Sequence, residues 1–141
     1  MDATTPVYTI DFTAKTDTYQ SALTNLFSGK PEDTERDLSK LFTPNLTPRA
    51  DNITRDFPTL VAHIRHLREI LSKVTLTVTQ FLRDGAQLAE RHTSSTTLSN
   101  GTAWWAETFQ FAEVAQDGQV SGIVETVSKL ERPGDVVSDN S

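Results

Sequence analysis

The stretch Val74-Thr-Leu-Thr-Val-Thr79 alternates apolar and polar residues, and it marks the point where the chain changes from helical to extended periodicity. Alternation of this kind, rich in β-branched residues, predicts a strand with one buried face. Three dipeptides follow it at nearly even intervals: Asp84-Gly85, Asn100-Gly101 and Asp117-Gly118. Such dipeptides favour type I′ hairpin turns, because both central residues adopt positive φ. The sequence therefore predicts a four-stranded antiparallel meander over residues 73–83, 86–99, 102–115 and 119–131.

The sequence before this meander has helical periodicity. A first helix begins after Thr16 or Asp17, ends at Gly29-Lys-Pro31, and has an apolar stripe of Tyr19, Leu23, Leu26 and Phe27. A second, short helix is predicted over residues 32–42. A third is predicted over 56–71, with Phe57, Leu60, Val61, Ile64, Leu67 and Leu71 on one face. We therefore predict an α+β fold, a cone-shaped barrel in which three N-terminal helices pack on a curved antiparallel sheet of four or more strands.

The composition is that of one acidic domain. With 141 residues we expect a single domain over 16–131, between an N-terminal tail of residues 1–15 and a C-terminal tail of 132–141. The net charge of −6, without a basic cluster, makes nucleic acid and anionic membranes unlikely as partners. The absence of cysteine excludes disulfides and thiolate metal sites. No signal peptide or long apolar run is found, so we expect a cytoplasmic protein that does not span a membrane.

The predicted turns set the register of the strands, provided that each loop has two residues. His92 then lies opposite Phe109 and Glu90 opposite Phe111, and residues two apart share a face. The face that we place against the helices carries Glu90, His92, Trp105, Glu107, Phe109, Phe111, Val124 and Thr126. The other face is mixed in composition and includes Arg91, Trp104, Ile123 and Glu125. That composition suits a sheet-to-sheet contact in a homodimer.

The order of these elements resembles a known family. Three helices precede the run Asp84-Gly-Ala-Gln-Leu-Ala-Glu-Arg-His-Thr93, which is similar to the "Gly-Asp-x-Val-Ala-x-Arg-Trp-Thr" stretch of the SnoaL-like branch of the nuclear-transport-factor-two-like superfamily. The matching residues are Gly85, Leu88, Ala89, Arg91 and Thr93, and His92 replaces the common aromatic. The later "Phe-x-Phe…Asp-Gly-x-Ile" pattern is met by Phe109, Phe111, Asp117, Gly118 and Val120. The resemblance covers roughly Tyr19 to Glu131.

This resemblance implies a cone-shaped pocket, a homodimer and no cofactor. Characterised relatives include polyketide cyclases, ketosteroid isomerase, scytalone dehydratase and limonene epoxide hydrolase, and the superfamily also contains members that only bind. The chain departs from the cyclase pattern at two places. Ser94-Ser-Thr-Thr97 replaces a common "Gly-Thr-His", and Val124, Thr126 and Ser128 stand where a tryptophan and an aspartate are common. The acid/base residue of the cyclases therefore has no counterpart by pattern.

His92 with Glu90 or Glu107 is our principal catalytic candidate. An apolar wall and a neighbouring carboxylate can bring such groups into a range useful for proton transfer. Tyr19 is the candidate hydrogen-bond donor to an oxyanion. The candidate substrate-binding residues are Trp105, Phe109, Phe111, Val124 and Thr126.

Structural alternatives to these roles stay open. His92 could be a core histidine, Glu90 could bind an arginine of the third helix, and Tyr19 could be a core aromatic. A bulge in the second long strand would exchange the faces of Arg91 and His92.

Other polar residues suggest sites less strongly. His63 and His66 have the spacing of a metal pair, but without a third ligand we expect a solvated helix face and no metal. Asp51, Arg55 and Asp56 precede the third helix, near the expected mouth of the cone, where a surface loop is the simpler interpretation.

Two classes of function remain. The first is a cofactor-independent isomerase or cyclase that uses acid–base chemistry in an apolar pocket on a hydrophobic, carbonyl-bearing small molecule, in secondary metabolism. Dehydration and epoxide opening are variants, and the latter needs an inward-facing Asp-Arg-Asp set that would include Arg91. The second class is a non-catalytic small-molecule-binding or dimerisation module. A cavity bordered by Glu90, His92 and Glu107 would favour the enzyme.

Overall fold

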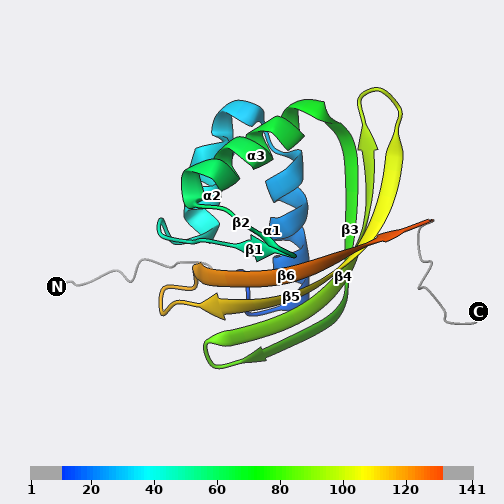
Figure 1. The fold of residues 1–141 in the computed structure, drawn as a ribbon. Coiled ribbons are helices and arrows are strands. Elements are labelled where there is room, and N and C mark those ends of the chain that lie inside the picture. The colour runs from blue at the N-terminus through cyan, green and yellow to red at the C-terminus, as the bar shows by residue number, and fades with distance from the viewer. Residues whose placement is uncertain (1–10, 132–141) are drawn as a thin grey trace, which may run out of the picture.

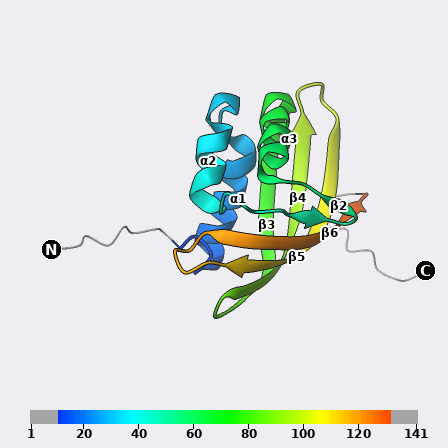
Figure 2. The same ribbon diagram turned by 60° about the vertical axis from the view of Figure 1, so that its left-hand side comes forward.

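The computed structural model describes residues 11–131, and the segments 1–10 and 132–141 lie outside the described residues. Three helices cover the concave face of a curved sheet (Figure 1). The helices are α1 (Thr16–Ser28), α2 (Thr34–Leu41) and α3 (Phe57–Ile70), with a 3-10 turn η1 (Pro31–Asp33) before α2. A view from another side shows all three helices on the same side of the sheet (Figure 2). The predicted α+β fold is confirmed.

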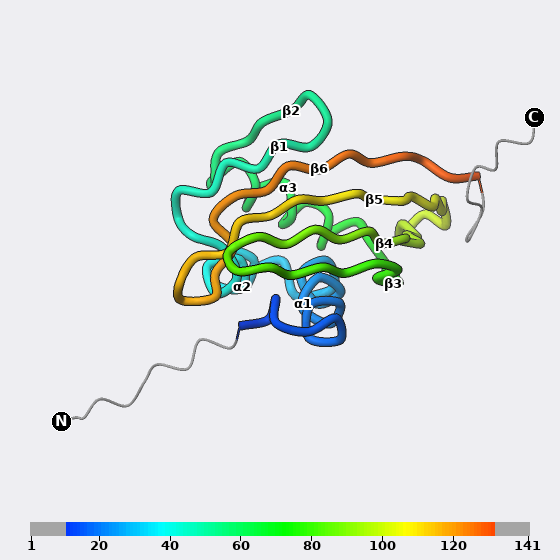
Figure 3. The backbone as a smooth tube through the Cα atoms, turned by 90° about the horizontal axis from the view of Figure 1, so that it is seen from below, coloured from blue at the N-terminus to red at the C-terminus, as the bar shows by residue number. Residues whose placement is uncertain are grey.

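The sheet has six strands in the order β2-β1-β6-β5-β4-β3 (Figure 3). The four long strands are β3 (Leu71–Asp84), β4 (Gln87–Leu98), β5 (Ala103–Val114) and β6 (Val120–Leu130), and they form the predicted antiparallel meander. A short hairpin of β1 (Arg49–Ala50) and β2 (Ile53–Thr54) extends the sheet, with β1 parallel to β6. The hairpin confirms the prediction of a sheet with four or more strands.

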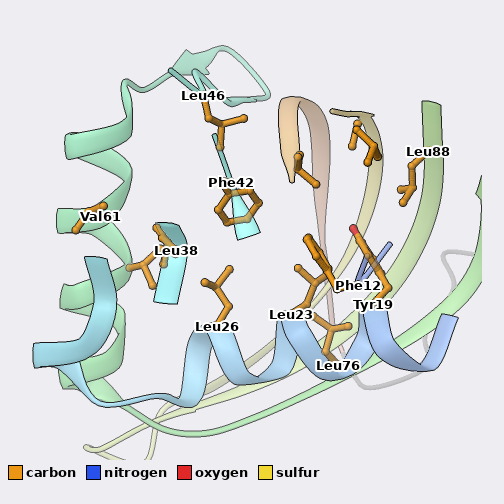
Figure 4. Packing of buried hydrophobic residues seen from close by; sticks show 14 residues of the cluster. Phe12, Tyr19, Leu23, Leu26, Leu38, Phe42, Leu46, Val61, Leu76 and Leu88 are labelled. Atoms are coloured by element: carbon orange, nitrogen blue, oxygen red, sulfur yellow. The ribbon is translucent and has the colours of Figure 1, made fainter. Parts of the chain in front are cut away.

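Apolar side chains between the helices and the sheet form the core. Tyr19, Leu23 and Leu26 of α1 are buried, as the spacing predicted, and they meet Leu76 of β3 and Leu88 of β4 (Figure 4). The carboxylate of Asp56 caps α3 by accepting a 2.9 Å hydrogen bond from the Thr59 N–H. These contacts fix α1 and α3 over the concave face.

Arg68 of α3 forms hydrogen bonds at the C-terminal end of α1. Its guanidinium is buried and donates to the carbonyls of Leu26 and Lys30 at 2.8 Å each, and it lies 3.0 Å from an Asp37 carboxylate oxygen. The Leu26 carbonyl lies in the last turn of α1, where carbonyls lack a helical N–H partner, so the guanidinium satisfies it and its charge favours the helix C-terminus. Gly29 leaves the space for this arrangement, because a Cβ there would lie 2.6 Å from the guanidinium. Arg68 is therefore engaged here, and it is not the partner of Glu90.

A β-bulge bends β3 beneath α1. The pairing with β4 shifts by one residue between Val78 and Gln80. The N–H of Val78 instead donates to the side-chain oxygen of Gln20 at 2.9 Å. Bulges increase local bending and twist, so this contact ties α1 to the curved part of the sheet.

The β4–β5 register differs from the prediction by one residue. The N–H of Leu98 donates to the Thr102 carbonyl at 2.8 Å, which leaves a three-residue loop that ends at Gly101. Only the glycine of the Asn-Gly pair has positive φ, 90°, whereas a type I′ turn requires it at both central residues. His92 consequently pairs with Thr108, and the predicted pairing with Phe109 is wrong.

The β5–β6 register is as predicted, although its turn is not. Phe109 pairs with Thr126 and Glu107 with Ser128. The loop again has three residues, since Ala115 N–H donates to the Gln119 carbonyl at 2.8 Å. A register shift between Glu113 and Val114 compensates for the longer loop.

The domain begins before α1. Phe12 and Thr13, which we assigned to an N-terminal tail, are buried, and the two residues are 6% and 0% exposed. The Phe12 ring stacks on Tyr19 with 6.1 Å between centroids. Residues 1–10 and 132–141 of the predicted tails lie outside the described residues. Within the described part, no helix is long and apolar enough to cross a membrane.

Candidate functional site

An internal cavity of about 330 Å³ lies between the helices and the concave face of the sheet. Its wall is mostly apolar, with Leu23 and Leu26 from α1, Ile64 and Leu67 from α3, and Leu76 from β3. A few polar side chains enter it from the strands, including those of His92, Thr108, Gln110 and Glu125. A mostly apolar cavity with a few converging polar groups is typical of small-molecule sites.

The polar groups are arranged in rows across the sheet. Glu90 pairs with Gln110, and Gln110 pairs with Glu125, so a carboxylate, an amide and a carboxylate occupy adjacent strands. His92 and Thr108 form the next row. Residues two apart along a strand share a face, so both rows face the helices.

Glu90 and His92 form a hydrogen-bonded pair, in which His92 lines the cavity and Glu90 is buried behind it. The His92 Nδ1 lies 2.8 and 2.9 Å from the two Glu90 carboxylate oxygens, and the Glu90 side chain is 0% exposed. A carboxylate only accepts hydrogen bonds, so Nδ1 carries the proton and donates. The other ring nitrogen, Nε2, is then the lone-pair nitrogen of neutral His92, on a side chain that lines the cavity.

Tyr19 supports the same carboxylate. Its hydroxyl donates to Glu90 Oε2 at 2.6 Å and accepts from Gln110 Nε2 at 2.7 Å. Burial and the negative charge of Glu90 raise the pKa of Tyr19 well above its usual value, so it is a neutral donor at physiological pH. The hydroxyl that we proposed for an oxyanion is therefore engaged with Glu90 in the free protein.

Glu125 is a second acidic group at the cavity. It is half-buried on β6 and lines the cavity. Burial raises its pKa, as does the negative charge of Glu90, while the positive charge of Arg55, and that of His92 when its imidazole is protonated, oppose the increase. Its neutral, proton-donating form therefore persists to higher pH than that of an exposed glutamate.

The structure does not bring the other predicted site residues to the cavity. Because of the β4–β5 register, the convex face carries Trp105, Glu107, Phe109, Phe111, Val124 and Thr126. Glu107 lies there with Arg91, whose Nε is 3.6 Å from its carboxylate, and the Arg91 guanidinium lies 5.8 Å from the centre of the Phe109 ring. Arg91 is thus on the outer face, as predicted, and the inward Asp-Arg-Asp variant is not formed with it.

Sequence reasoning missed several residues of the cavity. Trp104, Thr108, Gln110 and Glu125 were assigned to the wrong face or passed over, and the alternative of a three-residue loop ending in glycine is the signal that would have found them. His63 and Arg55 also line the cavity, although we placed them on a solvated helix face and a surface loop. Among residues 11–131, no group of three or more histidine, aspartate or glutamate side chains is arranged to hold a metal ion.

Solved structures share this fold. An NTF2-like protein of unknown function from an Exiguobacterium species superposes with a TM-score of 0.62 at 13% identity, covering 77% of this chain and 96% of that one. A candidate isomerase of the SnoaL-like family from Agrobacterium tumefaciens gives 0.60 at 10% identity over 80% and 97% of the two chains. IdmH, a candidate polyketide cyclase from Streptomyces antibioticus, gives 0.60 at 13% identity over 77% and 90%.

No protein-family model and no curated protein matches the chain in sequence. The structural likeness establishes an NTF2-like fold, as the sequence resemblance implied. A fold of this kind carries many functions, so the activity must be argued from the cavity.

Proposed function

We propose that this protein is a cofactor-independent isomerase or cyclase that moves a proton on a hydrophobic, carbonyl-bearing small molecule. The buried Glu90–His92 pair carries the proposal, because it holds an imidazole with a defined proton position against an apolar cavity. The fold shared with a candidate isomerase and a candidate polyketide cyclase is consistent with this chemistry and with a place in secondary metabolism. We also expect the protein to be cytoplasmic.

In the proposed reaction, His92 Nε2 removes a proton from the carbon next to the substrate carbonyl. The electron pair of the broken C–H bond moves toward the carbonyl oxygen and forms an enolate, while Glu90 stabilises the imidazolium through Nδ1–H. The proton then returns from Nε2, or from protonated Glu125, to another carbon of the conjugated system. In a cyclase, the enolate carbon instead attacks a second carbonyl of the same molecule, the C=O π electrons move to that oxygen, and the oxygen takes the proton from Nε2 to become a hydroxyl.

Exchange of substrate protons with solvent tests the proposal. The protein is incubated in D₂O with a panel of cyclic enones and aryl ketones, and deuterium incorporation next to the carbonyl is followed by mass spectrometry. We expect incorporation with wild type and a decrease of about 10²–10⁴-fold in His92→Gln. His66→Gln, on the exposed side of α3, is the matched control.

A compound that binds to wild type and His92→Gln alike, without exchange in either, would support the binding-module alternative instead. Binding is read from ligand-dependent stabilisation in thermal unfolding.

We also propose that the convex face forms the homodimer contact. Four large apolar side chains are exposed there, namely Leu82 and Phe111 (69% each), Val124 (43%) and Phe109 (40%). The proposal predicts a dimer in sedimentation analysis for wild type and a monomer for Phe111→Glu, because a charge in an apolar contact lacks a partner. A wild-type monomer at 100 μM or so would contradict it, as stable homodimers are tighter than this.

A further inference from the structure

The hairpin β1–β2 and α3 form the outer rim of the cavity. Val127 lines the cavity and is 41% exposed, whereas Tyr19 at the inner end is 1% exposed. The hairpin adjoins this exposed end, because the N–H of Val127 donates to an Asp51 carboxylate oxygen at 3.4 Å. Arg55, between β2 and α3, and His63, on α3, are the basic side chains of this rim that line the cavity.

The guanidinium of Arg55 has no hydrogen-bond or ion-pair partner among residues 11–131, although it is half-buried. Its backbone N–H is fixed by a 3.1 Å bond to the Pro48 carbonyl, so the residue is held in place, while no carboxylate of residues 11–131 lies within ion-pair distance of its guanidinium. Arg68, the buried arginine of α3, shows the contrast, since carbonyls and Asp37 satisfy it. A partly desolvated cation without a partner is poorly stabilised, so this rim suits an anionic ligand group.

The neighbouring charges limit what that group can be. The charges of Asp51 and Arg55 both act on Glu125, and burial favours the neutral form of Glu125. Asp56 follows Arg55 in the chain, and its carboxylate accepts the Thr59 N–H at the start of α3. His63 is neutral at pH 7, since burial and the charge of Arg55 lower its pKa, and it offers a hydrogen bond without a second charge. A single negative charge fits these surroundings, whereas a phosphate dianion would meet Asp51 and Glu125. A carboxylate also matches the planar donor geometry of a guanidinium.

We propose that the substrate carries a carboxylate that binds to Arg55 at the rim, while its apolar body fills the cavity toward His92. The inference deepens the proposed function and rests on it for the identity of the site. It defines the substrate class as a hydrophobic keto acid. Binding alone tests it, whether or not the compound reacts.

The probes are 3-benzoylpropionate and its primary amide, which share an aryl ketone and differ in charge. Their dissociation constants are measured by titration calorimetry at pH 7 for wild type, Arg55→Gln and Arg49→Gln. Arg49 is the matched control, because it is an exposed arginine of the same hairpin that does not line the cavity. We expect wild type and Arg49→Gln to bind the acid at least about tenfold more tightly than the amide, and Arg55→Gln to bind both about equally, since a charge-assisted bidentate pair is lost.

Equal affinity of wild type for acid and amide overturns the inference. So does an acid preference that survives in Arg55→Gln, or binding of neither compound at 10 mM or so, far weaker than a specific site requires. A different result would contradict the proposed function and leave the carboxylate subsite in place. An Arg55-dependent acid preference without deuterium exchange in any bound ketone would keep the carboxylate subsite and remove the catalytic role of His92.

Discussion

Replacing Glu90 with glutamine is expected to move the proton of His92 from Nδ1 to Nε2. Both the Tyr19 hydroxyl and His92 Nδ1–H donate to the Glu90 carboxylate, at 2.6 Å and at 2.8 and 2.9 Å. An amide has one oxygen acceptor and an NH₂ that only donates. If the oxygen keeps the bond from Tyr19, the NH₂ faces His92, whose Nδ1 must then accept.

The magnitude follows from the bonds that are lost. Loss of one hydrogen bond to a charged, fully buried carboxylate corresponds to about 2 kcal/mol of unfolding free energy. With an unfolding entropy of about 0.3 kcal/mol/K for 141 residues, this lowers Tm by about 7 °C. The effect on proton removal is larger, about 10²–10⁴-fold, because Nε2 of the altered tautomer has no lone pair for a substrate proton.

Nitrogen-15 NMR of histidine-labelled protein measures the proton position directly. The chain has three histidines, so His92 can be assigned by comparison with His92→Gln. Glu113→Gln, at an exposed position of β5, is the control, and it should change neither the tautomer nor Tm. The reasoning would be refuted by a neutral wild-type His92 protonated at Nε2, or by a Tm of Glu90→Gln within about 1 °C of wild type.

Three further substitutions test the packing, the acid and the turn. Gly29→Ala should destabilise the protein by about 1–3 kcal/mol in urea unfolding, because the new Cβ overlaps the Arg68 guanidinium at 2.6 Å. Glu125→Gln should abolish a decline in stability as the pH rises above 4.5. The raised folded-state pKa means that the native state binds more protons than the unfolded state there, so wild type loses stability with increasing pH. Gly101→Ala should lower stability by about 1–2 kcal/mol, because φ is 90° at that position.

The first substitution has a control variant, and each of the three has a result that would contradict the prediction. Ser21→Ala, on the exposed side of α1, should leave stability unchanged, and an equal effect of Gly29→Ala would exclude the clash. Parallel stability-versus-pH curves for wild type and Glu125→Gln would show that Glu125 is not the responsible group. An unchanged Tm of Gly101→Ala would contradict the three-residue loop.

The sequence was sufficient to predict the three helices and the four long strands, because each is marked by a pattern of residues within its own segment. The apolar stripe at Tyr19, Leu23 and Leu26 and the alternation after Val74 each lie within one element. Burial of Tyr19 and the inward direction of Glu90 and His92 followed from these patterns and the predicted order. This part of the site needed no information on how the strands pair.

The prediction of the other site residues depended on whether the loop between β4 and β5 has two residues or three. Asn100-Gly101 fits a two-residue or a three-residue hairpin, and the choice between them moves every side chain of β5 to the other face. Glu107 was therefore expected at the cavity in place of Gln110. The correct β5–β6 pairing did not help, because a bulge near Val114 compensated for a second turn of unexpected length.

The alternative roles of Arg68 and Glu90 could not be separated by sequence either. A helix periodicity places Arg68 near the apolar side of α3, but it does not show which acceptors the guanidinium reaches. Its acceptors are two carbonyls in the last turn of α1 and the carbonyl of Lys30 just after the helix. Such acceptors belong to every helix C-terminus, and only the packing angle of the two helices selects them.

The hydrogen bonds of Tyr19 join residues far apart in the chain. Tyr19 and Glu90 are separated by 71 positions, and Tyr19 and Gln110 by 91. Contacts across such long loops form after the local ones, because closing the loop costs chain entropy. We therefore expect the hydrogen-bond network of Tyr19, Glu90 and His92 to be completed only when the first helix docks on the sheet. If the helix detaches while the strands stay paired, Glu90 loses its hydrogen bond from Tyr19, so the proposed activity should disappear on heating or in denaturant before the sheet unfolds.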